Sequence, residues 1–257
     1  MSKSIEPVPF LTSLFDAAVE AAQPEKTICQ YLPEKPKGKV IVVGAGKASA
    51  QMGRAFERAW NEKHDEAVSG VIVTRYDYGC ECEFLEVIEA AHPVPDAAGE
   101  AGARRLLDLV SGLTEDDLVV ALISGGGSAL LPSPPDGLSL DDEIAVNQAL
   151  LASGAPISAM NTVRKHVSCI KGGRLASAAY PAKVVSLLVS DIPGDHPQYI
   201  ASGPTVADDG NRDDALAIIE QYQMKMPASV IRHIRSEASA APLPGDEHFL
   251  RSEHHII

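Results

Sequence analysis

Cysteine is scarce in this chain of 257 residues, which has four, at positions 29, 80, 82 and 169. Four scattered cysteines are too few for a disulfide scaffold, so we expect reduced thiols. Cys80 and Cys82 could touch a metal together, but no second cysteine or histidine pair stands at the spacing of a zinc site. The cysteines therefore predict neither a disulfide-stapled fold nor a zinc centre.

Long apolar runs are missing as well. The longest stretches, such as Val40–Val43 and Val184–Val189, fall far short of the roughly 20 residues that cross a bilayer. The first residues lack the apolar run of a signal peptide. We therefore expect a cytoplasmic protein without a membrane partner.

Positive charge is also in short supply. The chain has 22 lysines and arginines against 35 aspartates and glutamates, a formal net charge of −13. A surface that coats nucleic acid needs a basic excess, so we expect a small-molecule partner and no nucleic acid. The composition is otherwise ordinary, with 45% hydrophobic and 22% charged residues, which excludes the disordered and fibrous classes.

Apolar, β-branched runs alternate with helical patterns along the chain. The runs typical of buried parallel strands lie at residues 39–43, 70–74, 84–90, 118–123 and 183–189. The helical patterns lie at residues 9–22, 46–63, 97–110, 140–152, 157–169, 213–223 and 228–238. This alternation predicts an α/β fold with a parallel sheet and helices on both faces. We divide the chain into an N-terminal helix and proline-containing linker (1–38), the α/β domain (39–240) and a polar tail (241–257).

A glycine turn follows the first predicted strand. Gly44 and Gly46 lead through Lys47 into a helix, and such a turn exposes free N–H groups that suit a phosphate or a carboxylate. The Walker A pattern fails, because Ala48 stands where that pattern has serine or threonine. The dinucleotide pattern has Ser49 in place of its third glycine. An ordinary strand–helix turn with a surface lysine remains the alternative.

Three further loops carry polar residues. Ser124–Ser128, with three consecutive glycines, directly follows a buried strand, which favours a ligand loop over a flexible linker. Residues 160–176 hold the densest basic cluster, and Asn161 and Arg164 share one helical side where they could face an anion. A solvated basic face is the alternative there. Ser190–Asp195 follows the last predicted strand, and its two aspartates could be a general base and a Mg²⁺ ligand or merely cap the turn.

These loops together resemble the glycerate 2-kinase family, many of whose members are named hydroxypyruvate reductase. Each motif is weak alone, and the combination is specific. The resembling segments are VGAGKAS (43–49), AAHPVPD (90–96), LISGGGSALL (122–131), MNTVRKHVSCIKGGRLA (160–176), SDIPGD (190–195) and IASGPT (200–205).

The resemblance implies a Rossmann-like three-layer sandwich with a mostly parallel sheet, and ATP-dependent phosphorylation of D-glycerate to 2-phosphoglycerate. Lys47 would steady the transferring phosphoryl group, Asp191 would be the general base, and Asp195 would hold the Mg²⁺ that phosphoryl transfer requires. Asn161 and Arg164 would bind the substrate. The residues expected to bind the phosphate or carboxylate groups of ATP and glycerate, without a division between the two ligands, are Gly44, Gly46, Ser124, Gly125, Gly126, Gly127, Ser128, Lys171 and Gly172.

Members of that family continue well beyond Ile257 with a second domain. The resemblance therefore implies that residues 241–257 begin a linker to such a domain, that this chain alone is not fully active, and that a homodimer is one option. Two alternatives stay open. A hydroxypyruvate reductase using NAD(P)H would rely on Gly44, Gly46 and Arg75, which could meet a 2′-phosphate. A ligand-binding module would bind without turnover.

Overall fold

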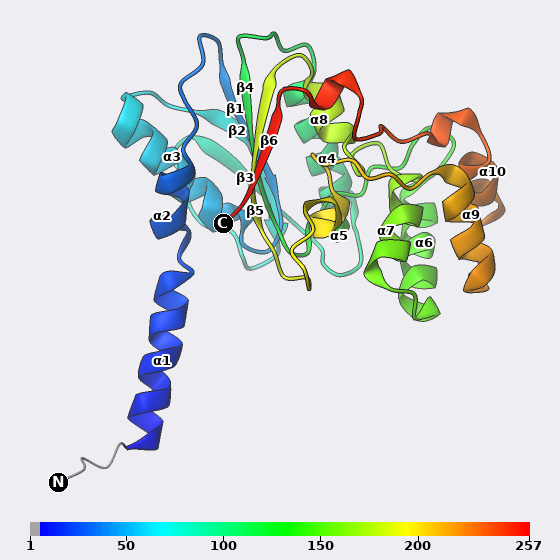
Figure 1. Cartoon of the computed structure of the whole chain (residues 1–257), viewed down its shortest axis with the longest axis horizontal. Helices are drawn as coiled ribbons and strands as arrows, with labels where there is room; N and C mark the ends of the chain where they lie inside the picture. The colour runs from blue at the N-terminus through cyan, green and yellow to red at the C-terminus, as the bar shows by residue number, and fades with distance from the viewer. Residues whose placement is uncertain (1–5) are drawn as a thin grey trace.

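A single parallel sheet organises the chain, as the computed structural model of residues 6–257 shows (Figure 1). Its strands are β1 (Val40–Ala45), β2 (Ser69–Arg75), β3 (Leu85–Ala90), β4 (Leu118–Ser124), β5 (Lys183–Val189) and β6 (Ser252–Ile256). They pair in the order β3-β2-β1-β4-β5-β6, and all five pairings are parallel. This is the strand order of the Rossmann fold, so the predicted fold class is confirmed.

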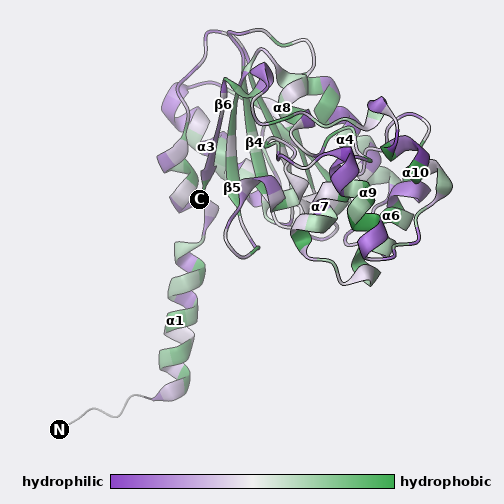
Figure 2. Ribbon diagram, turned by 45° about the vertical axis from the view of Figure 1, so that its right-hand side comes forward, coloured by the Kyte–Doolittle hydropathy of each residue, from purple (hydrophilic) through white to green (hydrophobic). Residues whose placement is uncertain are grey.

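The central strands are apolar because both faces of the sheet are covered. Every residue of β1 and of β4 is buried, as expected for strands that have helices on both sides. Figure 2 shows β4 and β5 as hydrophobic ribbons inside the molecule. The register pairs Val42 with Val120 and Val43 with Ala121, so the carboxyl ends of β1 and β4 lie side by side.

One helix covers the first face of the sheet and two helices cover the second. On the first face, α3 (Ser49–His64) packs Phe56 and Trp60 against the strands. On the second face lie α4 (Ala97–Val110) and α8 (Arg174–Ala179). Asp96 caps α4, since its carboxylate accepts a hydrogen bond of 3.0 Å from the Gly99 N–H.

A helical lobe lies beside the sheet, at the right of Figure 1. It consists of α6 (Leu140–Ser153), α7 (Ile157–Lys165), α9 (Arg212–Gln221) and α10 (Ala228–Ile234), which pack around an apolar core of their own. Short elements complete the chain: α5 (Gly127–Leu130), η2 (Pro197–Ser202), η3 (Glu237–Ser239) and η4 (Glu247–Phe249). The insertion of α6 and α7 between β4 and β5 places this lobe near the carboxyl ends of the strands.

The N-terminal helix α1 (Pro7–Ala21) projects away from the sheet and has no buried residue (Figure 1). The predicted linker after it contains two short helical elements, α2 (Pro24–Thr27) and η1 (Ile28–Tyr31), and Ile28 is fully buried in the core below α3. None of the helices that the structure describes is both long enough and apolar enough to cross a bilayer.

The prediction of a tail over residues 241–257 is wrong at its end, because β6 pairs in parallel with β5. The sequence of β6, Ser-Glu-His-His-Ile, has no apolar run, and three of its five residues are exposed. An edge strand is stabilised by backbone hydrogen bonds to one neighbour and tolerates polar side chains. Similarly, α7 ends at Lys165 and not at Cys169, since the His166 N–H donates to the Val163 carbonyl in a tighter turn.

Candidate active site

Four loops meet at the carboxyl ends of the strands. The loops after β1 and β4 start at neighbouring strands, and the chain leaves them toward opposite sides of the sheet. In open α/β sheets this switch point is where ligands bind. The loops that follow β3 and β5 border the same place.

Lys47 and Asp191 face each other across this switch point. The Lys47 Nζ lies 3.4 Å from Asp191 Oδ2, and the two side chains are 39% and 52% exposed. The carboxylate of Asp191 also rests against the backbone of Gly125, where a Cβ atom would overlap it. The two residues predicted to be catalytic are therefore brought together from β1 and β5, with a glycine of the β4 loop between them.

The β1 turn is held by the β4 loop rather than by an open set of N–H groups. The Lys47 N–H donates to the Gly125 carbonyl at 2.9 Å, and the Ala48 N–H donates to Ser124 Oγ at 3.0 Å. Gly46 has a φ of +144°, and a Cβ there would collide with Ser124. Ser124 is thus buried and joins two loops, which corrects its assignment as a phosphate-binding hydroxyl.

Gly44 is explained by packing as well. It lies inside β1 and is buried, and a Cβ there would come within 2.7 Å of the Leu122 carbonyl oxygen and 2.6 Å of Ile72 Cδ1. A side chain at this position would push the strands apart, so the packing of the sheet is enough to explain Gly44 without the predicted ligand.

Gly126 lies between two side chains of the site. Its φ is +88°, and a Cβ at this position would be 3.0 Å from both His92 Nε2 and Lys47 Cε. The next residue, Gly127, packs against Ala201 and begins α5. The triple glycine therefore admits Asp191, His92 and Lys47 to the same place, and the structure keeps Gly125 and Gly126 in the candidate site.

His92 is a member of the site to which the sequence analysis assigned no role. It follows β3, and it lines a cavity of about 160 Å³ with Gly126, Ser128 and Arg164. Burial lowers its pKa, and the positive charges of Lys47 and Arg75 lower it further. Its ring is therefore neutral near pH 7. Its place after a strand was the signal that could have found it.

Arg164 lines the same cavity, and a polar network joins it to the buried Asn161. Arg164 donates to Asn161 Oδ1 at 3.2 Å and, through Nε, to Asn147 Oδ1 at 3.1 Å. The Ser202 hydroxyl lies 2.8 Å from Asn161 Oδ1 and 2.9 Å from Ser128 Oγ. The structure thus brings the two predicted substrate-binding residues together with Ser128. No pattern in the sequence indicated Asn147.

Lys171 and Gly172 lie outside the site, contrary to prediction. The Lys171 side chain is 2% exposed, and its amino group contacts the carboxylate of Glu143 and the Leu131 carbonyl. Gly172 has a φ of +63° and donates to the Ser202 carbonyl at 3.0 Å. Gly172 thus holds the loop that carries Ser202, whereas Lys171 ties its own segment to Glu143 of α6, the partner that a buried lysine requires.

Asp195 is an exposed residue of the loop after β5, with a φ of +49°. Within residues 6–257, no group of three or more histidine, cysteine, aspartate or glutamate side chains is placed to hold a metal ion. Mg²⁺ usually binds through one or two carboxylates together with substrate phosphates, so a single exposed aspartate fits such an ion.

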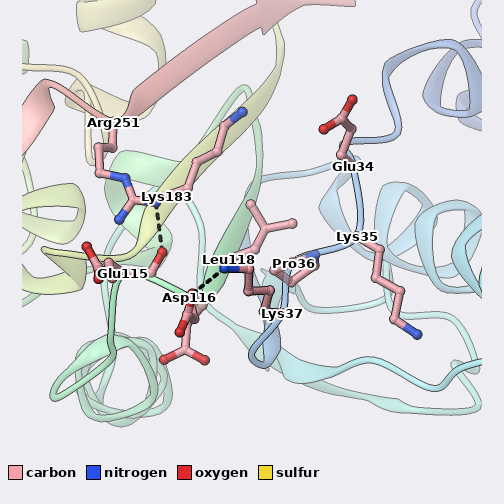
Figure 3. Close-up of a pocket in the computed structure, with 10 residues that line it drawn as sticks. Glu34, Lys35, Pro36, Lys37, Glu115, Asp116, Leu118, Lys183 and Arg251 are labelled. Carbon is pink, nitrogen blue, oxygen red and sulfur yellow. Dashed lines mark hydrogen bonds and ion pairs between the residues drawn. The ribbon is translucent and has the colours of Figure 1, made fainter.

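A second cleft of about 330 Å³ lies at the opposite edge of the sheet, before β1, β4 and β5 (Figure 3). It contains charges of both signs, including Lys183, Asp116 and Arg251, and the Arg251 guanidinium is already bonded to the carbonyls of Glu115 and Pro181. This cleft has neither a glycine loop nor an unpartnered buried polar group. We therefore place the candidate site at the carboxyl ends of the strands.

Comparison with protein families agrees with this architecture. Residues 10–235 match the family described as "Domain of unknown function (DUF4147)". The "D-glycerate 2-kinase" of Thermotoga maritima is 40% identical over 241 residues, which cover 93% of this chain and 55% of that protein. A "Putative hydroxypyruvate reductase" of Agrobacterium vitis is 52% identical over 236 residues, 92% of this chain and 53% of that protein.

A solved structure shows the same fold. The crystal structure of glycerate kinase from Thermotoga maritima superimposes with a TM-score of 0.80 at 38% sequence identity, over 94% of this chain and 56% of that chain. The chain thus spans about half the length of the curated relatives that it matches.

Proposed function

Because this chain belongs to the DUF4147 family and is homologous to proteins named glycerate 2-kinase, we propose that it takes part in ATP-dependent phosphorylation of D-glycerate to 2-phosphoglycerate. The observation that supports this most is the Lys47–Asp191 pair at the switch point of the sheet. A general base and a cation in one place are what phosphoryl transfer to a hydroxyl needs.

In the proposed reaction, Asp191 accepts the proton of the glycerate 2-hydroxyl. The oxygen of that hydroxyl attacks the γ-phosphorus of ATP. The new bond joins that oxygen to phosphorus, and the bond from the γ-phosphorus to its bridging oxygen breaks to release ADP. The Lys47 ammonium stabilises the negative charge of the transferring phosphoryl oxygens. Gly125 and Gly126 leave room for both side chains beside the reacting groups.

Magnesium belongs to the same proposal. Asp195 would hold the ion together with phosphate oxygens, and the ion would neutralise charge on those oxygens. Asp195 is exposed, so its carboxylate is accessible for this role.

The test is ADP release on addition of D-glycerate, with the position of the new phosphate read by ³¹P NMR. Replacing Lys47 by methionine should lower the rate on the order of 100-fold or more, because one stabilising charge is lost from the transition state. Lys37→Met is the matched control, since Lys37 is 90% exposed at the opposite edge of the sheet. Normal turnover by Lys47→Met would refute the assigned role.

A hydroxypyruvate reductase using NAD(P)H is the second candidate, and the Rossmann strand order and the names of some relatives favour it. Two features oppose it. Ser49, at the third glycine position, bonds to Ser124 at 3.2 Å, and Arg75 is stacked 4.2 Å above the ring of Tyr78 instead of reaching toward a phosphate. Steady consumption of NADPH with hydroxypyruvate would establish this alternative.

Three further expectations complete the proposal. If Mg²⁺-ATP raises the unfolding temperature but no ADP forms even when a C-terminal domain is restored, the chain is a binding module, the third candidate. A cytoplasmic location and a homodimer also stay predictions. The apolar residues exposed on α1, such as Phe10 and Phe15, are compatible with self-association, which sedimentation velocity would test.

A further inference from the structure

A small cavity beside the Lys47–Asp191 pair has a positive wall. The cavity holds about 160 Å³, and its polar lining comes from His92, Ser128, Asn147 and Arg164. Pro93 and Leu151 close its apolar side. Such a volume fits a group of a few heavy atoms and excludes a nucleotide.

The guanidinium of Arg164 is partly buried and has no counter-charge. It forms no ion pair with any carboxylate of residues 6–257, and Glu143, which lies near it, is already matched by Lys171. Burial lowers the pKa of Arg164, yet an arginine stays charged in proteins. An unpaired buried charge is unfavourable, and a bound anion would remove that cost.

Hydrogen bonds to two asparagine side chains fix the orientation of this guanidinium. Its Nε donates to Asn147 and its Nη1 donates to Asn161, which leaves Nη2 without a hydrogen bond to residues 6–257. Asn161 is in turn held by the Tyr199 carbonyl and by Ser202. The donor that remains is thus presented to the cavity by a rigid network and is not free to swing.

Two more donors line the same space. His92 places Nε2 beside Gly126, and Ser128 contributes a hydroxyl. A planar anion with two oxygens matches one guanidinium edge together with these donors, since arginine recognises carboxylates through paired hydrogen bonds.

We propose that the His92–Ser128–Arg164 cavity is a carboxylate subsite that selects short 2-hydroxy or 2-oxo acids and turns their second carbon toward Lys47 and Asp191. The proposal deepens the proposed kinase function by assigning the acid group of the substrate. It makes Arg164 and His92 determinants of specificity and Asn147 a positioning residue. The same subsite would serve hydroxypyruvate, so it does not depend on which of the two reactions is correct.

The first experiment measures the thermal unfolding of this chain with D-glycerate, D-lactate and glycerol. We expect the two acids to raise the unfolding temperature and glycerol, which lacks a carboxylate, to leave it unchanged. Equal shifts with all three compounds, or no shift with either acid, would overturn the proposal. This comparison needs no variant and therefore holds even where a substitution disturbs folding.

The second experiment compares variants by titration calorimetry. Arg164→Gln should weaken D-glycerate binding at least tenfold, about the loss of one charged hydrogen bond. Arg105→Gln is the matched control, since Arg105 is exposed on α4 and pairs with Glu86. Asn147→Leu should weaken binding of the acid without changing kcat at saturation, whereas a purely structural role would lower both kcat and the folded fraction.

The two proposals fail in different ways. If D-glycerate binds through Arg164 but no ADP forms from ATP even when a C-terminal domain of the relatives is joined to this chain, the kinase proposal fails and the subsite stands. If ADP forms and Arg164→Gln leaves the KM for D-glycerate unchanged, the kinase proposal stands and the subsite is refuted. Lys47→Met separates them further, because it should abolish turnover and keep the response to D-lactate.

Discussion

At the scale of single residues, the site depends on the absence of a side chain at Gly125. The Asp191 carboxylate rests where a Cβ would lie, so the proposed general base can take this position only because residue 125 is a glycine. Asp191 is half-exposed and can move aside, which separates the effect of a substitution on activity from its effect on folding.

We therefore predict that Gly125→Ala lowers kcat about tenfold or more, because a small displacement of the base disturbs the reacting geometry. The free energy of unfolding should change by less than about 1 kcal/mol. Gly245→Ala is the control, since a Cβ there meets no atom within 4 Å. Steady-state kinetics and urea unfolding measure the two effects, and equal kinetics for both variants would contradict the assignment.

The buried Lys171–Glu143 pair is a second residue-scale feature, and it is structural. Lys171→Met should cost about 3–5 kcal/mol of unfolding free energy, because Glu143 is left buried without its partner. The double variant with Glu143→Gln should recover most of that loss, since glutamine still accepts a hydrogen bond from the Ser133 N–H. Urea unfolding followed by circular dichroism gives both values. Strictly additive losses would mean that the two side chains act independently.

At the scale of elements, α1 is a helix that the sequence predicts and the body of the protein does not bury. Its apolar residues recur every three to four positions, as on one face of a helix, yet Leu11 and Phe15 are 61% and 67% exposed. A lone helix of this length is marginal in water, so its stability cannot come from contacts with the sheet.

We predict that removal of residues 1–17 changes the free energy of unfolding by less than about 0.5 kcal/mol, as for other surface changes. The residues kept after position 17 include Ala18 and Ala21, which border Met52. By contrast, Ile28→Ala should cost about 2–5 kcal/mol, because Ile28 is fully buried. Chemical unfolding of the three proteins makes the comparison. A large loss on removing α1 would show that the helix packs on the folded body in solution.

At the scale of the whole molecule, stability should respond to acid through buried histidines. His166 lies at the junction of the helical lobe, and its Nδ1 is 2.8 Å from the Ser239 carbonyl oxygen, to which it donates as a neutral ring. Burial lowers the pKa of His166, and Lys165 and Arg174 lower it further, whereas the hydrogen bond to Ser239 opposes the shift.

Below about pH 6.5, therefore, His166 binds a proton in the unfolded chain but stays neutral in the native protein. The free energy of unfolding then falls as the pH decreases, by at most about 1.4 kcal/mol per pH unit for one group. His166→Asn keeps a donor for Ser239 and should reduce this dependence. His254→Asn, at an exposed position of β6, should leave it unchanged. Urea unfolding at about pH 7 and about pH 5.5 measures the slopes. Identical slopes for His166→Asn and the unmodified protein would contradict the prediction.

The interior strands and the helices around them could be predicted from local patterns. The predicted run 183–189 coincides with β5, and Asp96 begins α4 as expected, because apolar periodicity and capping are encoded within a few residues. β6 could not be predicted, since an edge strand depends on a partner far away in the chain rather than on its own composition.

The sequence by itself determined the α/β class, the family resemblance, the loops in which Lys47, the glycines and Asp191 lie, and the helix that carries Arg164. Only the tertiary structure decided which of these residues share one site. In the folded protein Lys171 and Ser124 are buried and form hydrogen bonds with other protein groups. His92 and Asn147 line the same cavity as Arg164. The physical reason is that residue type and spacing report local conformation and burial, whereas the direction of a side chain follows from contacts between strands and loops distant in sequence.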